Sequence, residues 1–376
     1  MSERDLMVVA GEVSGDIHAA NMLSELHRTN PEIRAYGVGG ERLAAAGLDL
    51  VASTDELAHM GLIEVLRELP RIRQIMRRLV VEAERRRPAV AVLVDSPDFN
   101  LRLAARLRRL GIPVVLYVSP QLWAWRRGRV RTVRKLAQEV LCILPFEVPF
   151  YEAHGVHARY VGHPLVDEID RVGLLNRTST PERGWLAMLP GSRAMEVRQL
   201  LPVMLRTLQM MPPSLVKAAV LVEAPGMGAE VDTVLADCAT DTRLRRVRGE
   251  ERRRELASCE LAWTASGTAT LECALLDVPM VVGYRLQPVS YALAKLLVKV
   301  PNVALVNLIV GRTVVPELLQ NGWCAERLAA VTSEIFKSGA ASQKADLAEA
   351  RELLGSPGAS RQAAEAIAEY FRQPIQ

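Results

Sequence analysis

The feature that most constrains this chain is a repeated alternation of short apolar segments with longer helical patterns. Segments that are apolar on both faces are typical of parallel strands buried between two layers of helices. The expected strands lie at residues 6–10, 34–38, 89–94, 113–118, 140–144 and 159–161, and again at 185–189, 218–222, 244–247, 261–264 and 280–283. The pattern therefore predicts an α/β fold.

The alternation is interrupted once, by a polar and turn-rich stretch at about 167–184. A chain of 376 residues is also longer than one hydrophobic core usually serves. We therefore expect two Rossmann-like, doubly wound domains at 1–166 and 185–350, followed by a C-terminal helix at 351–376.

Composition excludes several classes of protein. Apolar residues make up 49% of the chain and charged residues 24%, which is ordinary for a globular protein. The longest candidate for a membrane span, 303–311, is short and contains Asn307. The N-terminus enters a strand without a signal peptide, and the five cysteines form no paired framework. These features predict a cytoplasmic protein with buried, reduced thiols.

Charge is distributed unevenly along the chain. The net charge is +4, but residues 67–135 contain eighteen Lys and Arg against five Asp and Glu, or +13, which leaves −9 elsewhere. A face that meets nucleic acid or an anionic membrane would explain this asymmetry, and so would solvated helix surfaces rich in arginine.

Two segments of the basic region combine apolar and cationic residues. Apolar residues crowd positions 57–69, and Pro70 is expected to begin a helix with Ile72, Ile75, Met76 and Leu79 on one face. Such a helix fits an acidic lipid surface or the face of a sheet equally well. The second segment has Trp123 and Trp125 beside several arginines, which suits base stacking or anchoring among lipid headgroups.

Candidate catalytic chemistry follows the strand at 89–94. Asp95 comes directly after this strand, where open α/β sheets place their ligands. Asp98 suits the N-cap of the next helix, so Asp95 is the better candidate for a general base. The turn at 11–16 joins another strand to a helix but is neither a dinucleotide fingerprint nor a P-loop. It is expected to be a tight connection beside a substrate cleft.

Two turns in the second half suit an anion. Gly191-Ser192-Arg193 and Ser266-Gly267-Thr268 each follow a strand and precede a helix, so backbone N–H groups and a guanidinium can meet a diphosphate. Glu272 is placed to accept hydrogen bonds from a ribose. A third element, a strand-and-loop stretch at 302–311, contains Asn307.

Six segments together resemble lipid-A-disaccharide synthases. They are GEVSGD at 11–16, MGLIEVL at 60–66, DSPDFN at 95–100, YVSPQLWAW at 117–125, LPGSR at 189–193 and SGTATLE at 266–272. The resemblance covers nearly the whole chain, in order and at family-like spacing. One position departs from the family pattern: Val306 stands where a proline is expected, which leaves the loop at Asn307 less preorganised.

The resemblance implies a GT-B glycosyltransferase that needs neither metal nor cofactor. It would move diacylglucosamine from UDP-diacylglucosamine to lipid X with inversion, using Asp95 as the base. The C-terminal domain would bind the donor and the N-terminal domain the lipid acceptor. The implied donor site consists of Gly191, Ser192, Arg193, Ser266, Gly267, Thr268, Glu272 and Asn307, and the acceptor and lipid site of Glu12, Ser14, Met60, Leu62, Ile63, Val65, Leu66 and Leu69.

The same resemblance implies a peripheral enzyme on the cytoplasmic face of the inner membrane, in contact with its anionic surface and not with nucleic acid. Family members can exchange C-terminal segments, so 351–376 either packs back on the N-terminal domain or is exchanged in a homodimer. No D-x-D sequence is present, so a metal-bridged diphosphate is not expected.

Three alternatives remain open from the residues themselves. Another GT-B transferase or a UDP-sugar epimerase would keep the second half unchanged but would not need the apolar 60–69 segment. A nucleic-acid-binding protein would use the basic first half and would ignore UDP. A nicotinamide-dependent dehydrogenase is disfavoured because no G-x-G-x-x-G follows a strand.

Overall fold

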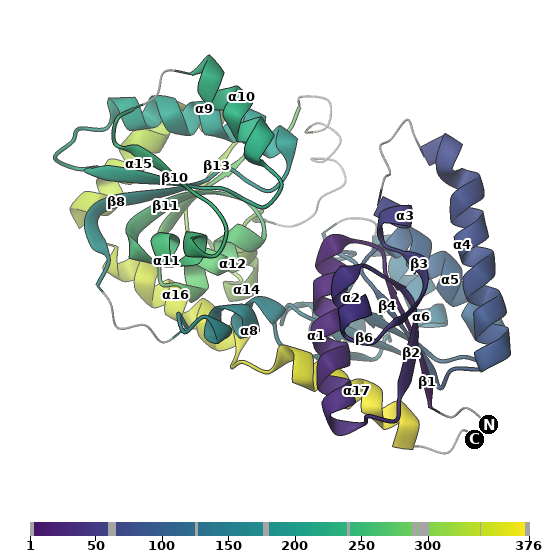
Figure 1. Cartoon of the computed structure of the whole chain (residues 1–376). Coiled ribbons are helices and arrows are strands. Elements are labelled where there is room, and N and C mark those ends of the chain that lie inside the picture. The colour runs from purple at the N-terminus through teal and green to yellow at the C-terminus, as the bar shows by residue number, and fades with distance from the viewer. Residues whose placement is uncertain are drawn as a thin grey trace. The chain divides into compact units, whose positions relative to one another are not determined.

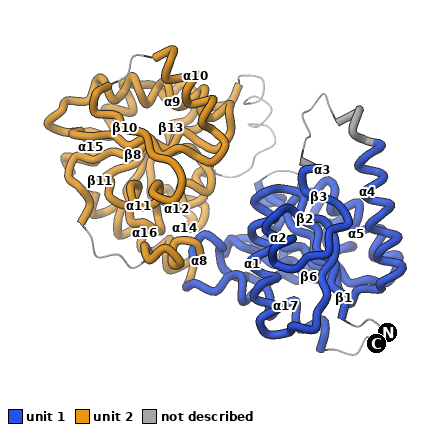
Figure 2. Tube along the Cα trace, viewed as in Figure 1, with its two compact units in different colours: residues 1–167, 356–376 blue, residues 168–355 orange. Residues whose placement is uncertain are grey.

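The chain divides into two compact units, which are described separately. The computed structural model describes residues 4–58, 65–124, 127–175, 180–238, 241–287, 291, 301–338 and 340–372. Unit 1 contains residues 1–167 and 356–376, and unit 2 contains 168–355 (Figure 2). The chain therefore returns to unit 1 after completing unit 2.

Unit 1 is built on one sheet of seven parallel strands in the order β3-β2-β1-β4-β5-β6-β7. The strands are β1 (Asp5–Ala10), β2 (Arg34–Gly39), β3 (Asp49–Ser53), β4 (Val90–Val94), β5 (Val114–Tyr117), β6 (Glu139–Cys142) and β7 (Ala158–Tyr160). Every residue of β1 and β4 is buried, which explains why both sequences are apolar apart from Asp5 at the start of β1.

Helices cover both faces of this sheet (Figure 1). One face packs against α1 (Val13–Thr29), α2 (Glu41–Ala45) and α17 (Ala359–Arg372). The other packs against α4 (Val65–Arg86), α5 (Pro97–Arg109), α6 (Val130–Leu136) and α7 (Glu147–Glu152). Short elements complete the unit: α3 (Asp55–Ala58), η1 (Arg127–Arg129) and the start of α8 (Pro164–Arg171).

Helix α4 begins earlier than predicted, and its contacts show which surface its apolar face packs against. Pro70 lies inside the helix rather than at its beginning, because the helix starts at Val65. Ile75, Met76 and Leu79 are buried in the core that lies between α4 and the sheet. The apolar face of α4 therefore packs on the protein, and the interpretation that it rests on lipid is wrong for this face.

Unit 2 repeats the plan with six parallel strands in the order β10-β9-β8-β11-β12-β13. They are β8 (Glu182–Leu189), β9 (Ala218–Val222), β10 (Leu244–Val247), β11 (Cys259–Ala265), β12 (Met280–Tyr284) and β13 (Glu317–Leu319). The helices are α9 (Ala194–Met210), α10 (Gly228–Asp237), α11 (Glu251–Ser258), α12 (Thr268–Leu275), α14 (Leu305–Val310), η2 (Gln320–Gly322), α15 (Ala325–Ser338) and α16 (Ala341–Leu354).

Strands β3 and β13 and helix α14 are among the elements that were not anticipated from the sequence. Strands β3 and β13 lie at sheet edges, where a strand pairs on one side only and needs fewer apolar residues. The stretch at 302–311, expected as strand and loop, contains helix α14 instead. Its run of β-branched residues favours a strand, but a buried side-chain network described below holds it as a helix.

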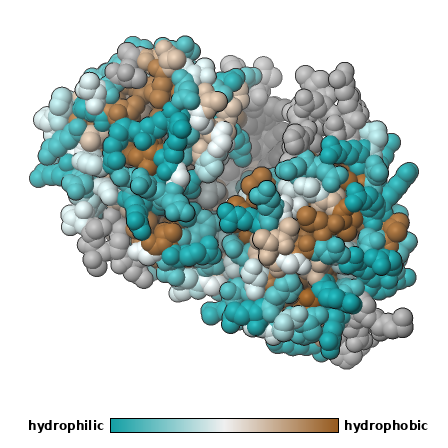
Figure 3. Space-filling model, viewed as in Figure 1, coloured by the Kyte–Doolittle hydropathy of each residue, from teal (hydrophilic) through white to brown (hydrophobic). Residues whose placement is uncertain are grey.

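The predicted fold class is confirmed: two doubly wound parallel sheets with a helical C-terminal tail. In the view of Figure 3, hydrophobic residues form separate areas among hydrophilic ones on both units. Within the described ranges, no helix has the length and apolarity needed to cross a bilayer.

Candidate functional site

Asp95 and the predicted glycine turns lie at the point where each sheet reverses its strand order. In unit 1 this point is between β1 and β4, and in unit 2 it is between β8 and β11. The helices that follow the two strands cover opposite faces of the sheet, and doubly wound folds generally bind their ligands at the carboxyl edge of such a point. The turn at Gly11 and Asp95 belong to the first point, and the turns at 191–193 and 266–268 belong to the second.

Asp95 ends β4 in an unusual backbone conformation. Both Asp95 (φ 55°) and Ser96 (φ 39°) are left-handed, which is uncommon for residues other than glycine and clusters at functional sites. The buried Asn100 holds this turn by donating its amide to the carbonyls of Val94 (3.0 Å) and Asp95 (2.7 Å). The Asp95 carboxylate is half-buried and accepts the Ser96 N–H at 2.9 Å.

Asp98 has a different role from the expected N-cap. Helix α5 begins at Pro97, so Asp98 lies inside its first turn and forms an ion pair with Arg129 at 2.6 Å. Ser96 holds the N-cap position instead.

The turn at Gly11 contacts the turn at Asp95 directly. A β-carbon on Gly11 would lie 2.2 Å from the Ser96 hydroxyl oxygen, and one on Gly15 would lie 3.5 Å from the β-carbon of Asp95. Glu12 and Ser14 are exposed at the start of α1, beside this pair of turns. Asp16, by contrast, is buried and accepts the N–H groups of residues 40, 42 and 43, so it secures the start of α2.

The segment after β5 is held by a buried carboxylate that the sequence analysis did not identify. Glu147 accepts hydrogen bonds from the Ser119 hydroxyl (2.6 Å) and the Trp123 indole (3.1 Å) on one oxygen, and from the Leu144 N–H (3.2 Å) on the other. Trp123 is buried edge-to-face on Phe146, so it does not form a free stacking surface. Trp125 lies outside the described residues.

In unit 2, Arg193 is the N-cap of α9, and its side chain is 78% exposed. Its guanidinium donates to Glu196 at 2.7 Å, and the same carboxylate accepts the Ser192 N–H at 3.0 Å. Gly191 has φ 118°, a backbone conformation that only glycine adopts readily. The turn at 191–193 therefore donates hydrogen bonds to one of the chain's own carboxylates.

The second turn is open. Gly267 (φ 126°) is the N-cap of α12, and apart from its two chain neighbours no atom of the described residues lies within 4 Å of where its β-carbon would be. Thr268 is exposed at the first position of the helix. The Ser266 hydroxyl donates to the Val303 carbonyl at 2.7 Å, which ties the turn to the segment before α14.

Glu272 is buried and paired with two arginines from α11. One of its oxygens accepts from Arg253 (2.8 Å) and Arg252 (3.4 Å), and Arg253 also contacts Glu168. The carboxylate is therefore held in place, and among the described residues its other oxygen accepts no hydrogen bond.

Asn307 is fully buried and its amide is saturated. The amide nitrogen donates to the Val315 carbonyl (3.0 Å) and to Glu317 (2.8 Å), and the oxygen accepts the N–H groups of Val314 (2.8 Å) and Val315 (3.0 Å). Glu317 also accepts the Val303 and Ala304 N–H groups at the start of α14. In this arrangement Asn307 supports the segment beside Ser266.

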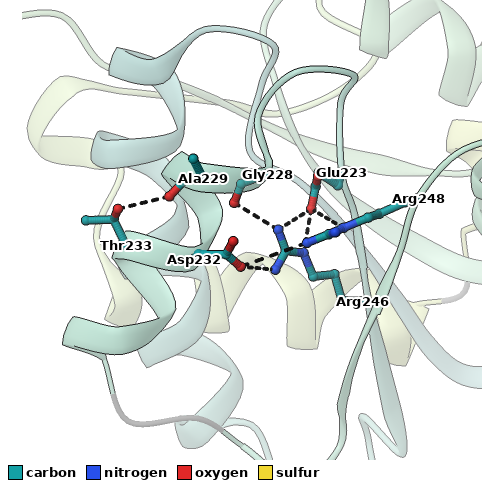
Figure 4. A network of polar contacts seen from close by, with 7 residues as sticks. All are labelled: Glu223, Gly228, Ala229, Asp232, Thr233, Arg246 and Arg248. Carbon is teal, nitrogen blue, oxygen red and sulfur yellow. Dashed lines mark hydrogen bonds and ion pairs between the residues drawn. The ribbon is translucent and has the colours of Figure 1, made fainter.

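A further polar network lies at the carboxyl ends of β9 and β10 (Figure 4). Glu223 accepts from Arg246 and from Arg248, the latter at 3.0 Å, and Arg246 also contacts Asp232 and the Gly228 carbonyl. These charges neutralise one another, so the network stabilises the loop between β9 and α10.

The predicted lipid-binding residues are only partly described. Met60, Leu62 and Ile63 lie outside the described residues, and for Val65, Leu66 and Leu69 only the helical backbone is described.

Comparisons with known proteins agree with the family that the motifs indicate. The family model described as lipid-A-disaccharide synthetase matches residues 6–371. Relatives named lipid-A-disaccharide synthase include that of Anaeromyxobacter sp. (strain K), 46% identical over 98% of this chain and 97% of the relative. That of Myxococcus xanthus (strain DK1622) is 43% identical over 97% of each chain.

Solved structures share the fold at low sequence identity. The calicheamicin glycosyltransferase CalG4 aligns over 100% of both chains with a TM-score of 0.63 and 14% identity. Acinetobacter baumannii MurG aligns over 97% of this chain and 99% of its own, with a TM-score of 0.60 and 11% identity. These structures establish the GT-B fold alone. With the family model and the relatives, they show that the chain belongs to the lipid-A-disaccharide synthases, which are glycosyltransferases.

Proposed function

We propose that the protein transfers diacylglucosamine from UDP-diacylglucosamine to lipid X, giving the lipid A disaccharide monophosphate and UDP. The primary hydroxyl of lipid X loses its proton to Asp95, and its oxygen attacks the anomeric carbon. The bond from that carbon to the β-phosphate oxygen breaks, the configuration inverts, and UDP leaves. No metal takes part.

The observation that carries the proposal is the strained turn at Asp95. Two successive left-handed residues, supported by the buried Asn100, present a half-buried carboxylate at the strand-order reversal of unit 1. Asp95 has no ion-pair partner among the described residues, unlike Asp98 beside it. A carboxylate in this position is suited to accept a proton from a bound hydroxyl.

Unit 2 supplies the groups that would bind the departing diphosphate. Arg193 and the N–H groups at the start of α12 provide positive charge at fixed positions, which favours a leaving group that gains negative charge. Gly191, Ser192, Gly267 and Thr268 line these two turns. Glu272 would bind the ribose through its free oxygen. Ser266 and Asn307 would position the second turn through the segment at 303–317.

The acceptor is assigned to unit 1. Glu12 and Ser14 are exposed next to Asp95, where they would contact the sugar of lipid X. We assign the acyl chains to Met60, Leu62, Ile63, Val65, Leu66 and Leu69, as the family resemblance implies. A lipid acceptor also places the enzyme on the cytoplasmic surface of the inner membrane, with arginines on unit 1 facing anionic headgroups.

Activity is tested by incubating the protein with UDP-diacylglucosamine and lipid X. We expect UDP release together with a disaccharide product, in the presence of a chelator. Release of UDP without disaccharide, or no reaction with lipid X, would exclude this function.

Asp95→Asn tests the base. It should lower the transfer rate by at least 10²-fold, the usual range for general-base removal, while UDP affinity stays nearly unchanged. A parallel loss of UDP affinity and activity would indicate a structural role for Asp95. Asp98→Asn, which removes a neighbouring carboxylate, is the control.

Arg193→Ala tests the donor site. It should weaken UDP binding by roughly tenfold or more, because a charge-assisted contact to phosphate is lost. Binding measured by calorimetry should change little for uridine, which has no phosphate. Equal UDP affinity in the variant and the parent would contradict the assignment.

A further inference from the structure

The two anion-suited turns of unit 2 differ in one respect. The turn at Gly267 faces open space among the described residues, whereas the turn at Gly191 is covered by the Glu196 carboxylate. A β-carbon on Gly191 would lie 2.4 Å from that carboxylate oxygen. The site that a phosphate would use is therefore filled by a side chain of the same charge sign.

The contacts of Glu196 are those of a bound anion. One oxygen accepts the Ser192 N–H at 3.0 Å and the other accepts the Arg193 guanidinium at 2.7 Å. Tyr284, at the end of β12, is also close. Burial raises the pKa of Tyr284, and Glu196 raises it further while Arg193 lowers it. The carboxylate is 16% exposed, although the arginine it pairs with is largely in solvent.

A purely structural role for Glu196 makes a different prediction. Glu196 is the third residue of α9, and glutamate at this position often accepts an N–H from just before the helix. Such a cap would stabilise α9 and would leave ligand affinity unchanged, or would raise it by holding Arg193 in place.

We propose that Glu196 competes with the diphosphate of UDP for the Ser192 N–H and the Arg193 guanidinium, and thereby sets the affinity of unit 2 for its nucleotide. The proposal rests on the donor site assigned above. When diphosphate binds, the Glu196 side chain turns away and its donors pass to phosphate oxygens. The displaced carboxylate remains near the diphosphate and repels it.

Replacing the Glu196 contacts by phosphate contacts costs little free energy, but the UDP that is then bound is held less tightly. The ion pair that must break involves an exposed guanidinium, and such pairs contribute little. The remaining repulsion between Glu196 and the diphosphate weakens bound UDP, which is the product as well as part of the donor. Glu196 would thus limit product inhibition, because UDP leaves more readily from a site that holds a carboxylate.

Glu196→Gln tests the proposal because glutamine keeps an oxygen that can accept the Ser192 N–H. Removing one negative charge within a few ångströms of the diphosphate should tighten UDP binding by about tenfold, as measured by calorimetry. Uridine affinity should not change. Raising the salt concentration should reduce the difference between variant and parent. Glu196→Ala, which removes both contacts, should tighten UDP binding in the same direction.

Glu230→Gln is the matched control. Glu230, on α10, also pairs with an arginine of α9, Arg198, and it does not contact Ser192 or Arg193 among the described contacts, so this variant makes the same charge change in the same unit. It should leave UDP affinity within twofold of the parent.

The outcomes separate cleanly. Tighter UDP binding in both Glu196 variants, with no change in Glu230→Gln, supports the competition. Unchanged or weaker UDP binding in Glu196→Gln overturns it and indicates that the residue caps α9 or orients Arg193. If the parent itself binds no UDP, the proposed donor site fails, and this result is distinct from a failure of the competition.

Discussion

Glu147 is a buried glutamate whose carboxylate is not solvated by water. Burial raises its pKa to about 7, although hydrogen bonds from Ser119, Leu144 and Trp123 act in the opposite direction. Cys142, Tyr151 and Tyr160 are the other titratable groups that interact with it, and the pKa values of all three are raised mainly by burial. The segment after β5 therefore depends on a group that titrates near neutral pH.

The raised pKa predicts how stability changes with pH. The folded chain binds the Glu147 proton more tightly than the unfolded chain, whose carboxyl titrates near 4.5. This contribution is complete below that value and is lost as pH rises toward about 7. The parent should therefore lose stability between pH 5 and pH 8, whereas Glu147→Gln should not. The difference in unfolding free energy between the two should shift in favour of the variant by at most roughly 3 kcal/mol over this range.

Urea unfolding at both pH values measures this difference. Glu152→Gln, on the exposed side of the same helix, is the control for loss of one charge. A difference between parent and Glu147→Gln that does not depend on pH would contradict the predicted titration.

At this scale the sequence located turns between strands and helices better than the contacts that side chains make. Asp95 and the two glycine turns were proposed as site residues because strand–turn–helix junctions are local patterns, and the structure has such junctions at these positions. The partners of Asn307, Glu272 and Trp123 come from other elements: Val315 and Glu317, Arg253, and Glu147 respectively. Spacing along the chain contains no information on such pairings, so the saturation of Asn307 could not be anticipated.

Helix α17 illustrates how an element can depend on a distant residue. Its first N–H groups, on Gly358, Ala359 and Ser360, all donate to the Asp167 carboxylate, at 2.5, 3.2 and 3.1 Å. Asp167 is on α8, far earlier in the chain, and it satisfies groups that a helix start leaves without partners. The connection back into unit 1 is thus secured by one side chain.

Asp167→Ala should destabilise unit 1 by about 1–3 kcal/mol, because buried N–H groups would lose their acceptor. Hydrogen exchange should quicken at the first turn of α17. Asp170→Asn, an exposed change on the same helix, should have little effect. Unchanged exchange at 358–362 in Asp167→Ala would show that the cap contributes nothing.

Elements with a clear hydrophobic pattern in the sequence were predicted well. Elements whose conformation depends on contacts with other segments were not. The buried central strands and α1 follow from continuous apolar runs and a glycine turn. Helix α14 was missed because Leu305, Val306 and Ile309 favour a strand when read alone, whereas Glu317 accepts N–H groups at the helix start. Pro70 was misplaced because proline is favoured at the first position of a helix, whereas α4 begins five residues earlier, at Val65, and has Pro70 in its interior.

The chain contains two parallel-sheet α/β units, and the alternation of strands and helices in the sequence predicted this repetition. The family resemblance gave the return of the C-terminal segment to the N-terminal domain as one of two alternatives, and the residues of the segment did not decide between them. Residues 359–372 form an amphipathic helix, and its alanine-rich face could pack on either sheet. Only the three-dimensional structure shows that Ala363, Ala364 and Ile367 enter the core formed by α1 and the unit 1 sheet.

This arrangement predicts that a change near the C-terminus destabilises the N-terminal sheet. Ile367 is fully buried in the core of unit 1, so Ile367→Asp places an unpaired carboxylate there and should cost more than ~3 kcal/mol. Hydrogen exchange should quicken in β1 and α1, while β8, β11 and UDP binding stay as in the parent. Gln362→Asp adds the same charge at an exposed position of α17 and should change neither unit. Equal loss of protection in both units would mean that they unfold as one, and would contradict their separate cores.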